Sequence, residues 1–410
     1  MSKRTATHKE THIPQLRFGG FDDNWEQRKV GDFLTESRVR GNTGLDAKKL
    51  TVKLWGKGVV EKNDFGGSEH TQYFTRRKGQ FIYSKLDFLN SAFGVIPEKL
   101  DNYESTADLP AFDLDGMNPY FMYFVAIQES FYLKHGSIAD GSRKAKRIHA
   151  DTFLNMPVMV PTIDEQNLIV DFLQHLDNLI TLHQHKHERL KSLKQAMLQK
   201  MFPREGELVP EIRFEGFTEP WEQRKVSDLV QIERGGSPRP IDDFITDSPD
   251  GLNWVKIGDA PAQGNRIIKT AEKIRPEGLS KTREVHPGDL ILSNSMSFGK
   301  PYIMGIDGCI HDGWLLIRNT YNIFDLTFLC HLLGTPQMLN QYRSLAAGST
   351  VNNLNKELVG NTVITIPKID EQRVIGQYLE QLDRLITLHQ RKYEKLLECK
   401  KTFLTKMFPS

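Results

Sequence analysis

The chain has 410 residues, of which 39% are hydrophobic and 26% charged, and its formal net charge is +2. This size favours two or three domains over one core, and the composition is typical of a globular protein. A polar N-terminal stretch and the lack of a long apolar run exclude a signal peptide and a membrane span, and three scattered cysteines (Cys309, Cys330, Cys399) disfavour a disulfide framework. We therefore expect a cytoplasmic protein, whose small positive charge permits nucleic-acid binding through local patches.

An internal repeat decides the predicted architecture. The stretch 14–34, PQLRFGGFDDNWEQRKVGDFL, returns at 210–230 as PEIRFEGFTEPWEQRKVSDLV, with more than half of its positions identical. The stretch 160–203, which begins VPTIDEQ and ends KMFP, returns at 366–409 with the same degree of identity. Such self-similarity indicates two copies of one unit.

The middle of each copy differs from that of the other. Residues 35–137 and 231–344 share little sequence, although short strands are predicted in both, at Phe81–Ser84 and at Asp289–Ser293. Asn118–Leu133 and Asp325–Tyr342 are apolar enough to form a helix that packs on each sheet. A constant frame indicates that both copies make the same contact through it, and a variable part indicates that each copy selects its own ligand through that part.

Each copy ends in a predicted long helix. Ile163–Phe202 contains neither proline nor glycine, and Asp164 is placed to cap its start. Steps of three and four residues between seam positions give the heptad pattern of a coiled coil, for which we prefer an antiparallel pairing with a pseudo-twofold relation between the halves. We expect His183 and His187 to meet Tyr393 and His389, respectively. The seam positions are Ile169, Leu173, Leu176, Ile180, His183 and His187 in the first helix, and Ile375, Leu379, Leu382, Ile386, His389 and Tyr393 in the second.

The fold class is therefore α+β, with two globular domains of mixed α/β structure joined by two long helices. A metal site at His183 and His187 is the alternative to a packed seam, but the second copy has tyrosine at one of the two positions and no third ligand lies nearby. The predicted divisions are a tail (1–13), a first domain (14–160), a first helix (161–203), a linker (204–209), a second domain (210–366) and a second helix (367–410).

The duplicated order RFxGFxxxWEQRKV, variable region, (I/V)PxIDEQ and a long helix ending KMFP resembles the specificity subunits of Type I restriction-modification systems. The resemblance covers nearly the whole chain. It implies two target recognition domains that bind double-stranded DNA, and a helix pair that sets the gap between two half-sites. It also implies two modification subunits that carry S-adenosylmethionine, restriction subunits that use ATP, and a chain that binds no cofactor and no metal and catalyses nothing itself.

Candidate DNA-binding residues are basic or polar residues near turns of the variable regions, since Arg and Lys bind phosphates, and Arg and Asn read guanine and adenine edges. An Arg/Lys-rich loop at 143–147 corresponds to an Asn-rich loop at 352–356. Gly235 and Gly236 would let the backbone approach a phosphate. The candidates are Arg38, Arg40, Lys85, Arg143, Lys144, Lys146, Arg147, Arg234, Ser237, Arg239, Ser293, Asn294, Ser297, Lys300, Asn352, Asn353 and Lys356.

Several features have a second interpretation. Each DNA candidate could be an ordinary turn residue. The framing aromatics Phe18, Phe21 and Trp25, with Phe214, Phe217 and Trp221, could stack on bases, but their presence in both copies favours core packing. Glu165–Gln166 and Glu371–Gln372 either hold each helix start against its own domain or face a modification subunit. Asn118-Pro-Tyr-Phe is only weakly similar to the tetrapeptide of adenine methyltransferases. A coiled-coil scaffold that binds no DNA is the alternative function.

Overall fold

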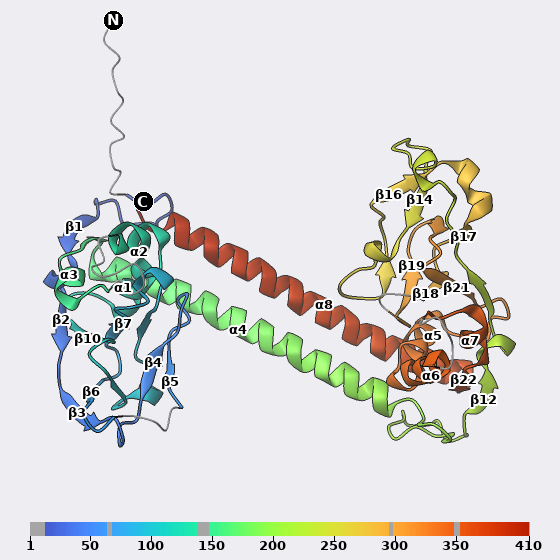
Figure 1. Cartoon of the computed structure of the whole chain (residues 1–410), viewed down its shortest axis with the longest axis horizontal. Coiled ribbons are helices and arrows are strands. Elements are labelled where there is room, and N and C mark those ends of the chain that lie inside the picture. The colour runs from blue at the N-terminus through green and yellow to red at the C-terminus, as the bar shows by residue number, and fades with distance from the viewer. Residues whose placement is uncertain (1–12, 64–67, 138–146, 295–297, 348–352, 410) are drawn as a thin grey trace, which may run out of the picture. The chain divides into compact units, whose positions relative to one another are not determined.

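The computed structural model describes residues 13–63, 68–137, 147–294, 298–347 and 353–409 (Figure 1). The chain forms two compact units. Unit 1 comprises Met1–Thr181 and Glu394–Ser410, and unit 2 comprises Leu182–Tyr393. Each unit thus combines one globular part with one end of each long helix, so the compact units divide the chain within its helices and not at their ends.

Unit 1 contains small sheets built from short strands. The central sheet has four strands in the order β2-β10-β7-β8, and a three-stranded sheet (β3-β6-β9), a hairpin (β4-β5) and an antiparallel pair of the two frame segments (β1-β11) accompany it. The strands are β1 (Glu26–Lys29), β2 (Leu34–Ser37), β3 (Arg40–Thr43), β4 (Leu50–Val52), β5 (Val59–Glu61), β6 (Gln72–Thr75), β7 (Phe81–Tyr83), β8 (Phe93–Val95), β9 (Glu104–Ser105), β10 (Ala111–Leu114) and β11 (Pro157–Val160).

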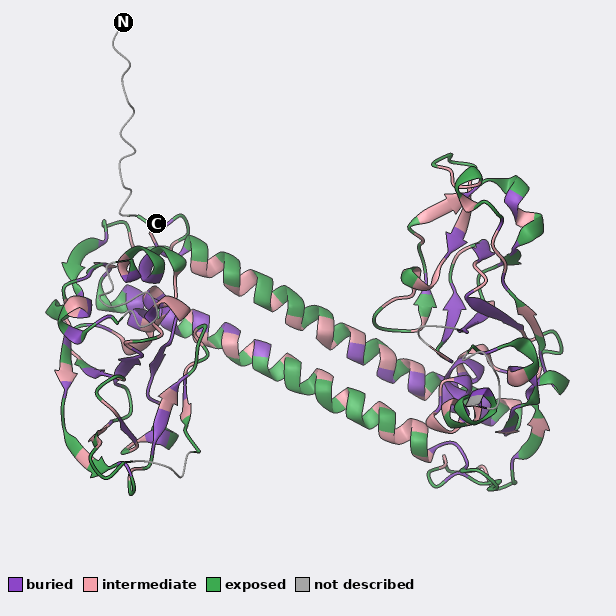
Figure 2. Cartoon of the chain, viewed as in Figure 1, coloured by how far each residue is buried: buried purple, intermediate pink, exposed green. Residues whose placement is uncertain are grey.

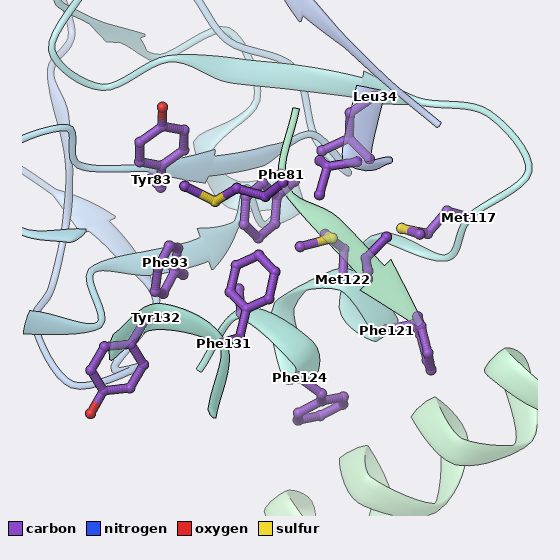
Figure 3. Close-up of a cluster of buried hydrophobic side chains, with 14 of the residues drawn as sticks. Leu34, Phe81, Tyr83, Phe93, Met117, Phe121, Met122, Phe124, Phe131 and Tyr132 are labelled. Carbon is purple, nitrogen blue, oxygen red and sulfur yellow. The ribbon is translucent and has the colours of Figure 1, made fainter. Parts of the chain in front are cut away.

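The core of unit 1 is aromatic. Side chains of β7 and β8 pack with side chains of α1 and α2 (Figure 3). The rings of Phe81 and Phe153 are stacked, with 5.6 Å between their centroids. Phe121 and Phe124 of α1 extend the same cluster toward the long helices. The helices are α1 (Pro119–Ala126), α2 (Glu129–Gly136), α3 (Ala150–Leu154) and α4 (Ile163–Lys200).

Unit 2 repeats the frame and changes the sheets inside it. A five-stranded sheet has the order β13-β21-β18-β19-β15, and a four-stranded sheet has the order β16-β14-β20-β17, while β12 pairs with β22 as β1 does with β11. The strands are β12 (Glu222–Lys225), β13 (Gln231–Arg234), β14 (Leu252–Val255), β15 (Arg266–Ile267), β16 (Glu272–Ile274), β17 (Arg283–Val285), β18 (Leu290–Ser293), β19 (Pro301–Met304), β20 (Gly308–Ile310), β21 (Trp314–Arg318) and β22 (Val363–Ile366).

The single helix predicted to pack on the sheet, at 118–133 in unit 1 and at 325–342 in unit 2, is broken in both units. Asn118 and Asp325 do cap the first helices, by accepting hydrogen bonds from the backbone N–H of Tyr120 and Phe328 at 2.9 Å. The helix then stops at a short turn near Ile127 in unit 1 and near Gly334 in unit 2, so a pair of helices replaces each single one that the sequence predicted. The helices of unit 2 are α5 (Leu326–Leu333), α6 (Pro336–Ala347), α7 (Lys356–Asn361) and α8 (Ile369–Lys406).

Burial of the seam positions is greatest near each globular part. Ile169, Leu173, Leu176 and Ile180 are buried in unit 1, and Ile375, Leu379, Leu382 and Ile386 are buried in unit 2, whereas the solvent-facing sides of both helices are exposed (Figure 2). Helix α4 begins at Ile163, so Asp164 lies in the first turn and is not the cap. There its carboxylate still interacts favourably with the helix dipole.

Within each unit the two helix segments run antiparallel, as predicted. In unit 1 Phe172 contacts Phe403, and Lys400 Nζ lies 2.5 Å from Asp177 Oδ1. In unit 2 Lys194 Nζ lies 2.6 Å from Asp383 Oδ1, which is the same pair of positions in the repeat. Such a charged pair at a partly buried seam fixes the register of one helix against the other.

The polar seam residues lie between the helices, but their pairing differs from the expected one, since His183 and not His187 meets His389. His183 Nδ1 lies 2.8 Å from His389 Nδ1, and burial is the largest cause that lowers the pKa of both rings. His187 faces the backbone carbonyl of Ile386 at 3.2 Å and not a side chain, and Tyr393 is half-buried. Among the described residues, no group of three or more His, Cys, Asp or Glu side chains is placed to hold a metal ion.

The frame carboxylates hold each helix start against its own globular part. Arg17 donates to both oxygens of Glu165 at 2.6 and 2.8 Å, and Arg213 does the same to Glu371 at 2.7 and 2.8 Å. Gln166 and Gln372 accept from the backbone N–H of the caps Asn118 and Asp325 at 3.0 Å. All four Glu and Gln side chains are buried. We call these buried contacts, which hold each helix start against its own globular part, the internal fasteners of the frame.

The framing aromatics are core residues. Trp25 and Trp221 are buried, and each contacts an α1 or α5 phenylalanine, Phe121 or Phe328. Phe18 and Phe214 pack on Phe172 and Tyr378 of the long helices, and Phe21 and Phe217 are half-buried. Four of these rings, Phe18, Trp25, Phe214 and Trp221, thus pack in or against the core, which agrees with the core-packing prediction.

Candidate DNA interface

Two arginines lie just beyond β2 in unit 1. Arg38 donates to Glu36 Oε2 at 2.9 and 2.7 Å, and this carboxylate raises the pKa of the guanidinium. Arg40 is exposed on β3. Both side chains reach solvent, so both are available to a phosphate, although Arg38 would have to exchange or share its carboxylate partner.

A buried arginine that the sequence analysis missed supports this strand end. Arg76 donates to Ser105 Oγ at 2.8 Å and to the carbonyls of Ser37 and Leu109 at 2.8 and 3.0 Å. Burial lowers its pKa to about 10, which leaves it charged near neutral pH. Arg76 therefore fixes the chain on which Arg38 stands, and it is too buried to contact DNA itself.

The basic loop of unit 1 is described only at its end. Arg143, Lys144 and Lys146 lie outside the described residues. Arg147 is partly exposed, with Nε 3.7 Å from Asp108 Oδ1, and Lys85 is half-buried where its carbonyl accepts from the N–H of Ile148. The contact between the Lys85 and Ile148 backbones shows that this loop returns to the end of β7.

In unit 2 the corresponding basic residues surround Asp312. Arg239 Nη2 lies 3.9 Å from Asp312 Oδ2, Ser237 Oγ donates to Oδ1 at 3.2 Å, and Arg234 Nε donates to the Asp312 carbonyl at 3.4 Å. The side chain of Arg239 is 83% exposed. An exposed arginine that is loosely held by one carboxylate can turn to a phosphate or a guanine edge.

A cleft of about 980 Å³ opens beside Arg239. Its polar wall carries an ion pair between Lys256 and Glu272, and its apolar wall carries Trp254 and Ile241. The lining residues are Ser237, Pro238, Arg239, Pro240, Ile241, Asp242, Ile245, Trp254, Lys256, Glu272 and His311. A concave site with a few polar groups is the usual form of a ligand pocket.

The glycines at 235 and 236 serve the protein's own backbone. A side chain at Gly235 would collide with the carbonyl oxygen of His311, and one at Gly236 with that of Lys281. Their N–H groups donate to the carbonyls of Trp314 and Ile310 at 2.9 and 3.2 Å. The expected role as a phosphate cradle is therefore wrong, because these donors are already used.

Two further candidates are corrected by burial. Ser293 Oγ accepts from the N–H of Lys300 at 3.0 Å, and Asn294 Nδ2 donates to the Asp312 carbonyl at 2.7 Å. Both residues are buried, so they shape the loop and do not present a side chain to DNA. Lys300 is exposed, with Nζ 4.9 Å from the centre of the Tyr302 ring, and Ser297 lies outside the described residues.

The Asn-rich loop leads into a helix. Asn355 caps α7 by accepting from the N–H of Leu358 at 2.8 Å, which is a structural role. Asn353 is exposed, and Lys356 is exposed with Nζ 3.8 Å from Glu357 Oε1. Asn352 lies outside the described residues. The part of this loop available to a ligand is therefore Asn353 and Lys356.

The sequence analysis also missed the β4–β5 hairpin of unit 1. Its turn carries the exposed residues Lys53, Trp55 and Lys57. The alternating apolar positions of KKLTVKLWGKGVVEK and the Trp-Gly turn were the available signal. They predict an exposed, basic hairpin.

Two units that share one frame and carry different exposed basic residues define a protein that recognises a two-part ligand. The model of the Type I restriction modification DNA specificity domain matches twice, over residues 22–192 and 218–398. The chain belongs to this family, and its two domains recognise DNA sequence.

Known relatives agree with the family. The chain is 23% identical to the Type I restriction enzyme MjaVIII specificity subunit of Methanocaldococcus jannaschii, over 97% of this chain and 95% of the relative. It is 22% identical to the putative MjaX specificity subunit of the same organism, over 97% and 96% of the two chains.

Solved structures share the fold. The S subunit of a Type I restriction-modification system from M. genitalium matches with a TM-score of 0.60 at 14% identity, over 97% of this chain and 99% of that one. A chain from a structure on complex assembly and conformational transition of the type I R-M system matches with a TM-score of 0.50 at 15% identity, over 95% and 99%. Within the described residues, no helix has the length and apolarity to cross a membrane.

Proposed function

We propose that unit 1 and unit 2 each read one half of a bipartite duplex sequence, and that the chain thereby directs two modification subunits and the restriction subunits to that sequence. The modification subunits would methylate adenine, and the restriction subunits would cleave the DNA. The length of α4 and α8 would set the gap between the half-sites.

One observation carries the proposal: the two units repeat the same internal fasteners around different variable regions. The Arg17–Glu165 and Arg213–Glu371 pairs, and the buried Trp25 and Trp221, occupy matching places in the repeat. Because these side chains are turned inward, they are not available to select a sequence. Selection therefore falls to the exposed residues of the variable regions.

Those exposed residues have the chemistry that duplex DNA requires. Arg38 and Arg40 in unit 1, and Arg239 and Lys356 in unit 2, offer cations for phosphates, which supply most of the affinity. Arginine and asparagine side chains can also read base edges in the major groove. The different sets in the two units support different half-sites.

We place the catalytic chemistry in the partner subunits. In this proposal S-adenosylmethionine binds the modification subunits and ATP binds the restriction subunits, while this chain binds neither and acts as a non-catalytic adaptor. Support comes from membership in the specificity family and from Asn118, whose side chain caps α1 and is therefore committed to a structural role. The place of action would be the cytoplasm, where the DNA lies.

The test is co-expression with the cognate modification subunit in a host without adenine methylation, followed by single-molecule sequencing of methyladenine across the genome. We expect one motif of two short half-sites around a fixed gap. A verified complex that leaves the genome unmethylated would contradict the proposal and favour a scaffold that binds no DNA.

A further inference from the structure

Trp55 is the exposed tryptophan of this protein. The chain has five tryptophans, and the other four (Trp25, Trp221, Trp254 and Trp314) are buried, whereas Trp55 is 60% exposed at the turn of the β4–β5 hairpin. The neighbouring Leu54 is exposed as well. A single exposed apolar side chain is ordinary, but a large one on a strained turn is not.

The backbone of Trp55 is held in an unfavourable conformation. Its φ is 60°, in the left-handed region that a bulky side chain rarely adopts. The Trp55 N–H donates to the Asn90 carbonyl, and the Gly56 N–H donates to the Ser91 carbonyl, both at 2.8 Å. These bonds keep the turn in place while the indole remains in solvent.

A third contact fixes the turn from the helix side. The Tyr123 hydroxyl of α1 donates to the Gly56 carbonyl at 2.6 Å, and burial raises the pKa of Tyr123 to about 12. At the base of the hairpin, Leu50, Val52 and Val59 are buried in one cluster with residues of the central sheet. The indole is thus presented on a rigid support.

The side chains that flank the indole within the turn are positively charged. Lys53 and Lys57 lie on either side of it, and both are exposed. Positive side chains beside an exposed aromatic ring form the usual combination for a nucleic acid, since phosphates bind the cations and bases stack on the ring.

We propose that Trp55 stacks on a base at the half-site read by unit 1, while Lys53 and Lys57 bind the flanking phosphates. This inference rests on the proposed function, because it needs unit 1 to bind duplex DNA. An apolar side chain that enters a base step unstacks it, and the cost of unstacking depends on the step. Trp55 would therefore contribute to sequence preference as well as affinity.

The first test uses the tryptophan emission of the full chain. Since the other indoles are buried, acrylamide quenching of the red-edge emission reports Trp55. A duplex that carries the mapped bipartite target should shield this emission from acrylamide, and anisotropy of a dye on the same duplex measures binding independently. Binding without any change in the accessibility of Trp55 would overturn the inference, whereas an absence of binding would count against the proposed function itself.

Variants of Trp55 separate a loss of base stacking from a loss of folding stability. Trp55→Gly suits a φ of 60°, so we expect an unchanged or higher melting temperature together with about 5- to 100-fold weaker DNA binding. Trp55→Phe should retain part of the affinity. The matched control is Tyr321→Ala, which removes an aromatic ring that is 67% exposed on a turn of unit 2, and which should leave the affinity for the unit 1 half-site unchanged.

Salt dependence distinguishes the ring from its lysines. Lys53→Ala and Lys57→Ala should each reduce the slope of log affinity against log salt by about 0.9, because each removes one phosphate contact. Trp55→Gly should leave this slope unchanged. Unaltered affinity of Trp55→Gly at every salt concentration would refute the stacking role.

Discussion

In unit 1 the ring of Phe124 lies under Lys400, whose Nζ is 5.8 Å from the ring centre, and Lys400 also pairs with Asp177. In unit 2 the corresponding position on α5 is His331, whose Nε2 lies 3.6 Å from Asp383 Oδ2, beside Lys194. The same helix-to-helix ion pair is thus backed by a hydrocarbon ring in one unit and by a titratable ring in the other. The repeat therefore keeps the Lys–Asp ion pair between the helices in both units, while the residue beside the pair differs between the units.

The variable regions differ more than the frames. Unit 1 presents a basic hairpin whose exposed Trp55 stands on a fixed turn, and unit 2 presents a cleft beside Arg239 with Trp254 buried in its wall. A protruding surface and a concave surface suit different contacts with a duplex. We therefore expect each unit to select its half-site independently of the other.

The largest effect should come from exchanging a whole variable region. Replacing residues 35–158 with the corresponding region of another family member should change one half-site completely and leave the other unchanged, because the fasteners of each frame lie within its own unit. Methyladenine mapping of the exchanged complex measures both halves at once. Simultaneous change of both half-sites would disprove local selection.

Lengthening the helices should alter the gap and not the half-sites. An insertion of about one heptad in both α4 and α8 keeps the seam in register and adds about 10 Å at 1.5 Å per residue. We expect a motif with the same half-sites and a gap longer by about three base pairs at 3.4 Å each. The gap hypothesis fails if the mapped spacing stays as it was.

Breaking a fastener should destabilise either unit equally. Glu165→Ala and Glu371→Ala each leave a partly buried arginine without its carboxylate, at a cost of about 3–5 kcal/mol. Denaturant unfolding of the full chain measures this loss. The control Glu36→Ala removes the exposed pair with Arg38 and should cost less than about 1 kcal/mol. Unequal effects of the two frame variants would show that the frames are not equivalent.

The last effect is a loss of stability of unit 2 in acid, which is absent at neutral pH. Burial is the main cause that lowers the pKa of His331 to about 3, and the nearby Lys194 acts in the same direction. A folded-state pKa below the unfolded value of about 6.5 means that stability is fully present above pH 6.5 and is lost as pH falls toward 3, by up to about 1.4 kcal/mol per pH unit.

His331→Phe copies the residue of unit 1 and removes this titration. Hydrogen exchange of α5 and of α1, followed between pH 7 and pH 4, separates the two units. We expect acid to loosen α5 in the parent chain and to have less effect on it in His331→Phe. Equal acid loosening of α5 in both chains would rule out His331 as the cause.

Sequence alone could predict the long helices and their seam, because heptad spacing is a local property that repeats in both copies. It also predicted that Trp25 and Trp221 belong to the core, and this is confirmed by their burial. It could not predict that the single helices at 118–133 and 325–342 are each broken in two, since α2 after the break packs through Phe131 on Phe88, a residue from a distant segment.

The candidate site was less predictable. Arg239 and Arg40 are exposed, whereas Ser293 and Asn294, equally polar in the sequence, are buried. The exposure of a side chain depends on which segments pack together. The two variable regions share little sequence, so a position in one has no counterpart in the other from which its exposure could be inferred. Trp55 was missed because its significance lies in a positive φ and in backbone contacts with Asn90 and Ser91.

The duplication, the order of frame and variable region, and the family can be derived from the residues alone, because each is carried by residues that recur at fixed positions. Only the folded chain shows that Glu165 and Glu371 face inward to Arg17 and Arg213, since a carboxylate near a helix start can bind its own domain or a partner equally well. It also shows which cations reach solvent. The physical reason is that burial arises from contacts between segments far apart in the chain, which local residue patterns do not encode.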